Sequence, residues 1–119
     1  GANIVIHAHG DNIDKIANLT KFFTSVLGTT QSQPIGNLYN FGGFSDGDRA
    51  LFLAVALNAK EITLAGMDFG EIITKYSRPN IETSLAKADD FKKKKLYYAE
   101  KFTQWIIDNE DVDIVNLSR

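Results

Sequence analysis

The sequence predicts an α/β fold, a three-layer arrangement of a parallel sheet of about four strands with flanking helices, in one domain over residues 1–119. Two observations predict it. Short β-branched runs alternate along the chain with longer segments whose apolar residues recur at every third or fourth position. The hydrophobic share of 44% and the charged share of 24% are those of an ordinary globular domain. Strands separated by helices favour a parallel sheet with right-handed crossovers.

Four runs are predicted to be strands. Each is rich in β-branched or apolar residues, and they cover residues 3–8, 25–30, 61–65 and 113–117. The first run is apolar enough to be expected as a strand buried on both faces. A Gly- and Asn-rich loop is expected over residues 31–44, and a second loop from 68 to about 80.

Three segments are predicted to be helices. Residues 13–23 have an amphipathic pattern. Ser45 can cap a helix that runs through residues 49–58, with Asp46 and Asp48 in its first turn, and its nearly all-apolar surface predicts a deep position. A long helix is expected from about 82 to 108. Its inward-facing residues are predicted to be Leu85, Ala88, Leu96, Ala99, Phe102 and Ile106.

Composition excludes several classes of protein. The net charge of −2 gives no electrostatic attraction for nucleic acid. No apolar run reaches the roughly 20 residues that a membrane span needs, so no membrane partner is expected. The chain has no cysteine, which excludes disulfides and thiol chemistry and fits a cytoplasmic protein. It opens on Gly1 without an initiator Met, which suggests a trimmed fragment of a larger domain.

Three polar clusters follow predicted strands, at residues 7–12, 40–49 and 66–70. In parallel sheets ligands bind beyond the carboxyl ends of the strands, so these clusters are expected to meet along one edge. Gly-rich turns and helix starts offer backbone N–H groups to an anion, and carboxylates hold Mg²⁺. Together they indicate a nucleotide or phosphoryl-transfer site.

The two histidines of the chain, His7 and His9, lie in the first cluster beside Asp11. Imidazole titrates near neutrality, which suits phosphate binding, proton transfer or metal ligation. The alternative is a pair of histidines hydrogen-bonded to loop backbone. Zinc is disfavoured, because two histidines alone make an incomplete site.

The second cluster lacks the Walker A order of residues, so its glycines are either phosphate-binding or simply turn the loop. Its acids, Asp46 and Asp48, are either metal ligands or favourable charges at a helix start. Arg49 can form bidentate hydrogen bonds with a phosphate or pair with Asp68 of the third cluster. Asp68 itself is a metal- or ribose-binding carboxylate or a turn residue.

Other side chains are open to two interpretations. A lysine among residues 92–95 reaches a phosphate or belongs to a solvated helix face. The rings of Phe41, Phe44, Phe69 and Tyr76 either stack on a flat heterocycle or pack in the core.

The linked motifs resemble one family. They are His-Ala-His-Gly-Asp-Asn at 7–12, Gly-Thr-Thr-Gln at 28–31, Asn-Phe-Gly-Gly-Phe-Ser-Asp-Gly-Asp-Arg at 40–49, Gly-Met-Asp-Phe-Gly at 66–70, and the Lys-rich stretch before Leu96. In this order they resemble the archaeal 6-hydroxymethyl-7,8-dihydropterin diphosphokinases. Members of that family are longer, so the resemblance implies that this chain corresponds to their carboxyl-terminal half.

The resemblance implies a Rossmann-like core and a Mg²⁺-dependent transfer of diphosphate from ATP to the pterin hydroxymethyl group, leaving AMP. The reaction that the resemblance implies is a step in the synthesis of tetrahydromethanopterin or folate-type cofactors. The expected partners are ATP, a pterin and Mg²⁺. The residues assigned to catalysis are His7, His9, Asp11 and Asp68. Those assigned to binding are Asn12, Thr30, Gln31, Asn40, Gly42, Gly43, Asp46, Gly47 and Arg49, and those assigned to the metal are Asp46, Asp48 and Asp68.

Two other functions are compatible with the same edge of the sheet. One is a transferase that uses a nucleotide-sugar donor, and the other is a non-catalytic nucleotide-binding domain. An unpaired strand or core face at the trimmed start would favour self-association, so a homo-dimer or a missing partner segment is also expected.

Overall fold

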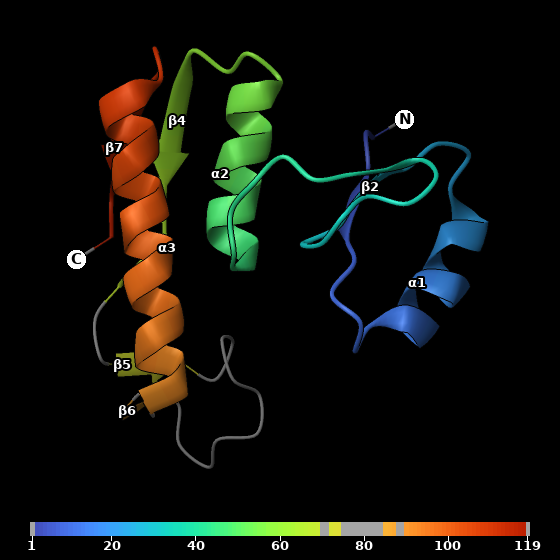
Figure 1. The fold of residues 1–119 in the computed structure, drawn as a ribbon, viewed down its shortest axis with the longest axis horizontal. Coiled ribbons are helices and arrows are strands. Elements are labelled where there is room, and N and C mark those ends of the chain that lie inside the picture. Colours follow the sequence, from blue (N-terminus) through green and yellow to red (C-terminus); the bar gives the residue numbers. More distant parts are fainter. Residues whose placement is uncertain (1, 70–71, 75–84, 88–89, 119) are drawn as a thin grey trace. The chain divides into compact units, whose positions relative to one another are not determined.

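The computed structural model describes residues 2–69, 72–74, 85–87 and 90–118. The chain divides into two compact units, Gly1–Gly42 and Gly43–Arg119. Figure 1 shows the strands and helices of each. Both units are α/β with parallel strands, as the alternation of strands and helices predicts. The single domain expected over residues 1–119 stays a prediction.

The first unit is a three-stranded parallel sheet in the order β1-β2-β3. Its elements are β1 (Val5–His7), α1 (Ile13–Leu19), the 3-10 helix η1 (Thr20–Phe22), β2 (Leu27–Thr29) and β3 (Leu38–Tyr39). The predicted strands at 3–8 and 25–30 and the helix at 13–23 are confirmed, with shorter bounds. β3 lies in the segment expected to be a loop, and the sequence pattern missed it.

β1 is less covered than its composition predicts. Val5 is 38% exposed and the next two residues are half-buried, so the expectation of burial on both faces is wrong. α1, which follows β1, buries none of its own residues and leaves Ile13 66% exposed. An amphipathic helix normally buries its apolar stripe, whereas the apolar residues of α1 stay half-buried or exposed.

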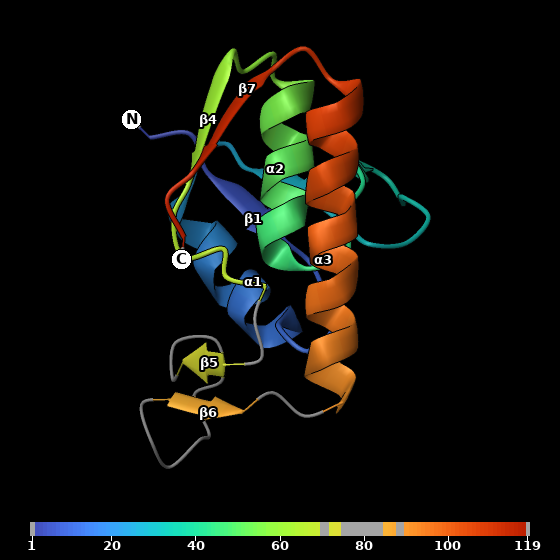
Figure 2. The same cartoon turned by 90° about the vertical axis from the view of Figure 1, so that its left-hand side faces the viewer.

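The second unit has a two-stranded parallel sheet of β4 (Glu61–Leu64) and β7 (Asp113–Asn116), as predicted. Its helices, α2 (Asp46–Ala56) and α3 (Asp90–Asn109), lie side by side next to this sheet in Figure 2. The core contains Leu51, Leu64 and Ile106, one residue from each of α2, β4 and α3. α2 is therefore deep along one side, although its C-terminal neighbour Leu57 is 64% exposed.

The long helix begins later than expected. Leu85–Lys87 forms a strand, β6, that pairs antiparallel with β5 (Ile72–Thr74). Its backbone groups bond to another segment of the chain instead of to the next helical turn, so the prediction of a helix from residue 82 is wrong over 85–87. Within α3, Ala99 and Ile106 are buried as predicted. Gly70, Tyr76 and Ala88 lie outside the described residues.

Among the helices in the described part of the chain, none is both long enough and apolar enough to cross a lipid bilayer.

Candidate functional site

The carboxyl ends of the three strands in the first unit lie at one edge of their sheet. His7 is in register with Thr29, and Thr29 is in register with Tyr39. The alignment continues past the strands, since Ala8 N donates to Thr29 O at 2.8 Å and Thr30 N donates to Tyr39 O at 2.9 Å. The structure thus brings together residues 7–12 of the first polar cluster, residues 40–42 at the start of the second, and residues 30–32, which overlap the motif at 28–31. This edge is where parallel sheets bind ligands.

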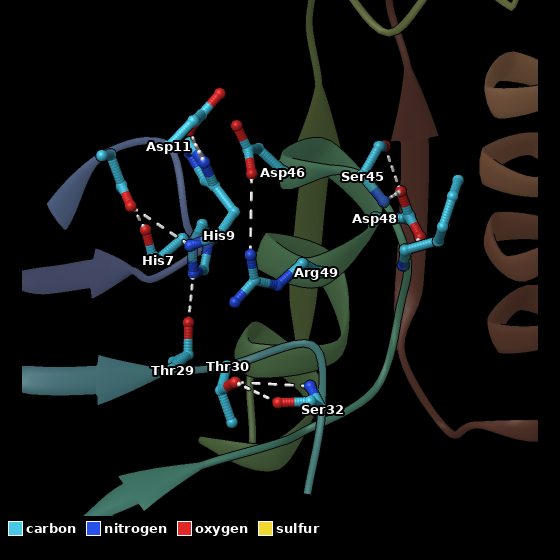
Figure 3. A network of polar contacts seen from close by, with 12 residues as sticks. His7, His9, Asp11, Thr29, Thr30, Ser32, Ser45, Asp46, Asp48 and Arg49 are labelled. Atoms are coloured by element: carbon cyan, nitrogen blue, oxygen red, sulfur yellow. Dashed lines mark hydrogen bonds and ion pairs between the residues drawn. The ribbon is translucent and has the colours of Figure 1, made fainter. Parts of the chain in front are cut away.

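His7 is held by its neighbours at this edge. Its Nδ1 forms a short hydrogen bond with Oγ1 of Thr29, which is only 3% exposed (Figure 3). The side-chain amide of Asn12 donates to His7 O at 2.7 Å and accepts from His9 N at 3.2 Å. His7 and Asn12 therefore fix the turn that follows β1.

His9 and Asp11 form an exposed pair on the same turn. His9 Nδ1 lies 2.5 Å from Asp11 Oδ1, and the two side chains are 32% and 84% exposed (Figure 3). A carboxylate at Nδ1 favours the tautomer with its proton there, which leaves Nε2 as an acceptor. This is the arrangement that a general base needs.

The loops after β2 and β3 are joined by short polar side chains. Thr30 Oγ1 accepts from Ser32 N at 3.3 Å and lies 3.2 Å from Ser32 Oγ. Asn40 donates through Nδ2 to Ser32 O at 3.2 Å, and its Oδ1 accepts from Gly42 N at 3.0 Å. Gln31 is exposed between Thr30 and Ser32. Sequence reasoning missed Ser32, although a hydroxyl two residues after a threonine is a turn signal.

In the second unit Ser45 and Asp48 form a capping box at the start of α2. Asp48 accepts from Phe44 N at 2.5 Å, from Ser45 N at 2.8 Å and from the Ser45 hydroxyl (Figure 3). Its side chain is fully buried, at 0% exposure. These contacts engage both carboxylate oxygens, so the geometry assigns Asp48 to the helix cap. The spacing of Ser45 and Asp48 is the sequence signature of that cap.

The turn before α2 passes close to the backbone of Arg49. Gly43 has φ +83°, and a Cβ there would lie 2.7 Å from Arg49 N. Arg49 is itself 3% exposed, and its Nη1 lies 3.7 Å from Asp46 Oδ1. Burial lowers the pKa of the guanidinium, while the nearby charges of Asp46 and Asp48 raise it. Arginine remains cationic throughout, so the head of α2 carries one fixed positive charge beside the carboxylates of Asp46 and Asp48.

The first turn of α2 contacts the turn that follows β4. A Cβ on Gly47 would lie 2.5 Å from Met67 Sδ. Asp46 and Asp68 are the chain neighbours of these two residues, and both are exposed. Each of the two residues in this contact therefore has an aspartate next to it in the chain. In the segments that the structure describes, no three His, Asp or Glu side chains gather into a group that could hold a metal ion.

The exposed carboxylates of Asp46 and Asp68 suit Mg²⁺ only when a substrate supplies further oxygen ligands. Mg²⁺ is often bound by one or two carboxylates together with substrate phosphates. Asp46 and Asp68 are the exposed carboxylates of the predicted metal set, whereas Asp48 is occupied by the cap. The prediction that all three polar clusters meet at one edge stays a prediction, since it joins residues of both units.

The chain matches known proteins over most of its length. A family model described as 6-hydroxymethylpterin diphosphokinase MptE-like matches residues 2–74. A 6-hydroxymethyl-7,8-dihydropterin pyrophosphokinase of Methanothermobacter thermautotrophicus is 52% identical over 114 residues, which are 96% of this chain and 49% of that protein. Proteins of the same name from Methanocaldococcus jannaschii and Pyrococcus furiosus are each 45% identical, over 97% and 98% of this chain and 50% of their own length.

The chain spans about half the length of the curated relatives it matches. No solved structure matches it significantly. The family model covers more than half of the chain, and the relatives share its sequence nearly from end to end. The chain therefore belongs to the MptE-like 6-hydroxymethylpterin diphosphokinase family.

Proposed function

We propose that the protein to which this chain belongs transfers diphosphate from ATP to the hydroxymethyl group of 6-hydroxymethyl-7,8-dihydropterin. Membership of the family supports this, as do the names of three relatives that are pyrophosphokinases of this pterin. The observation that links the proposed function to particular residues is the His9–Asp11 pair, which is exposed at the carboxyl edge of a parallel sheet. An exposed base at that edge suits a reaction that removes a proton from a bound hydroxyl.

The transfer is a displacement at the β-phosphorus of ATP. The hydroxymethyl oxygen forms a bond to that phosphorus, and the bond from it to the oxygen bridging the α- and β-phosphorus atoms breaks. AMP leaves with the electron pair of the broken bond, and the hydroxyl proton passes to His9 Nε2. Asp11 orients the imidazole through Nδ1, 2.5 Å away, and stabilises the imidazolium once the proton arrives.

The second unit, taken by itself, has residues that suit phosphate binding. The cation of the buried Arg49 favours the negative charge of a phosphate. Gly43 permits the close turn that leads into this helix. Since phosphoryl transfer depends mainly on positioning and charge neutralisation, such contacts supply much of the catalysis.

Mg²⁺, when bound with the nucleotide, would neutralise phosphate charge and polarise the phosphorus–oxygen bonds. Asp46 and Asp68 are the side chains we assign to it. We assign substrate binding to the residues that follow β2 and β3, which are Thr30, Gln31 and Asn40. Asn12 is assigned to holding the turn that contains His9.

The test uses the protein expressed from its complete reading frame, with ATP, Mg²⁺ and 6-hydroxymethyl-7,8-dihydropterin. We expect AMP to form only when the pterin is present. Asp11→Asn should lower kcat by about a hundredfold, because His9 then loses the carboxylate that orients it and stabilises its imidazolium, and a well-positioned base contributes at least that much. Asp14→Asn is the matched control, since Asp14 is also an acid of the first unit and lies exposed in the first turn of α1. Absence of AMP from the wild-type protein would refute the proposed function, and an unaffected Asp11→Asn variant would refute the role of the pair.

A further inference from the structure

A cluster of aromatic rings and one lysine lies beside the start of α2. The ring of Phe44 meets the ring of Tyr98 edge-on, with centroids 6.2 Å apart and an angle of 68° between the ring planes. Lys95 Nζ lies 5.9 Å from the centroid of Phe44 and 5.8 Å from that of Phe91. Phe44 precedes the helix cap, and the other three residues lie on α3, which runs alongside α2 (Figure 2).

These rings are not core residues. Phe44 is 40% exposed, Tyr98 is 51% exposed and Phe91 is 71% exposed, while Lys95 is half-buried between two of them. A lysine in a run of four would ordinarily extend into solvent, but Lys95 lies over aromatic faces instead. Aromatic rings beside a cation offer a ligand both a stacking surface and hydrogen-bond donors.

The backbone holds Phe44 next to the proposed phosphate contacts. Phe44 N donates to the buried carboxylate of Asp48 at 2.5 Å, so the residue is fixed at the cap of α2. The cation of Arg49, at the same helix start, favours an anion. A molecule with a phosphate at the cap and a flat ring attached to it would therefore reach Phe44.

We propose that Phe44, Tyr98 and Lys95 form the platform on which a planar bicyclic nitrogen heterocycle of the substrate is bound. The inference rests on the proposed function and adds which side chains recognise the ring. Phe44 and Tyr98 offer the aromatic surface on which such a ring stacks. Lys95 has donors and no acceptor, so it selects an edge of the heterocycle that carries ring nitrogens or a carbonyl oxygen. The purine of the nucleotide and the pterin both have this chemistry.

The experiment measures dissociation constants by calorimetry on the protein from its complete reading frame. The ligands are ATP, inorganic tripolyphosphate and 6-hydroxymethyl-7,8-dihydropterin. Phe44→Leu removes the aromatic face and keeps an apolar side chain, and Phe44→Tyr restores the ring. Phe22→Leu is the matched control, because Phe22 is 80% exposed in η1, outside the cluster.

We expect Phe44→Leu to weaken binding of the ring-bearing ligand by about tenfold, which is typical of a lost stacking contact. Tripolyphosphate should bind as to the wild type, which also shows that the variant is folded. Phe44→Tyr and Phe22→Leu should bind like the wild type. If Phe44→Leu weakens the binding of ATP alone, the ring that stacks on Phe44 is the purine. If it weakens the binding of the pterin alone, that ring is the pterin.

Two results would overturn the proposal. One is a Phe44→Leu variant that binds both ATP and the pterin as tightly as the wild type. The other is an equal loss for tripolyphosphate, which would place Phe44 in phosphate binding or in folding. A different result would refute the proposed function, namely a wild-type protein that binds these ligands and forms no AMP.

Discussion

Gly43→Ala tests whether the turn before α2 depends on a residue without a side chain. Gly43 has φ +83°, and an added Cβ would lie 2.7 Å from Arg49 N, 2.8 Å from Arg49 Cα and 2.9 Å from Asp48 C. All three atoms belong to the backbone of α2, so no flexible side chain can move away to make room. The turn and the helix start would have to separate.

Two costs contribute to the expected loss of stability. A left-handed backbone conformation costs an alanine about 1–2 kcal/mol. The steric contact adds about 1–3 kcal/mol, the usual range for overpacking. Against these, alanine restricts the unfolded chain and recovers about 0.4–1 kcal/mol. We therefore expect Gly43→Ala to lower the free energy of unfolding by about 2–4 kcal/mol.

Gly66→Ala separates the two costs. Gly66 lies in the same unit with φ +72°, and a Cβ there would meet nothing within 4 Å. Its variant has the conformational cost alone, about 1 kcal/mol after the unfolded-state gain. Urea unfolding of both variants followed by circular dichroism gives the difference, which isolates the contact with Arg49. Equal losses for the two variants would refute the reasoning.

Three further predictions test the cap, the core and the histidine pair. Asp48→Ala should destabilise the protein by about 1–3 kcal/mol in urea unfolding, because it leaves buried N–H donors unpaired. Ile106→Ala should cost about 2–5 kcal/mol, since this side chain is 0% exposed, whereas the change at Ile107, which is 47% exposed, should cost far less. His9→Gln should lower kcat more than it raises KM for the pterin, because the loss is one of proton transfer in the transition state; a change in KM alone would contradict it.

The order of strands and helices was predictable because it depends on local patterns. The runs that became β1, β2, β4 and β7 are each bounded by turn residues, and Ser45 marks the start of α2. The elements that were missed lack such a pattern. β3 has two residues, too few to show a period. β6 was assigned to a helix because it has only three residues, and pairing with β5 leaves no signal within so short a segment.

The candidate site was predictable in its location more than in its contacts. Parallel strands in register place the segments that follow them at one edge, so the predicted strands indicate where residues 7–12 and 30–32 lie. Residues 40–42 follow β3, which was not predicted, so their place at this edge comes from the structure alone. The partners of each side chain depend on rotamers and on the path of each loop. Neither the bond between His7 and Thr29 nor the role of Ser32 follows from spacing.

The charged residues at the head of α2 show why burial decides between roles that the sequence leaves open. Asp46, Asp48 and Arg49 all fall within four positions, and each suited either phosphate chemistry or helix capping. Asp48 is fully buried and Arg49 nearly so, while the side chain of Asp46 is 68% exposed. A buried carboxylate needs hydrogen-bond donors from the protein itself, and Asp48 obtains them by capping the helix. An exposed carboxylate keeps its oxygens accessible to a metal ion, and for this reason we propose Asp46 and Asp68, and not Asp48, from the predicted set of three magnesium ligands.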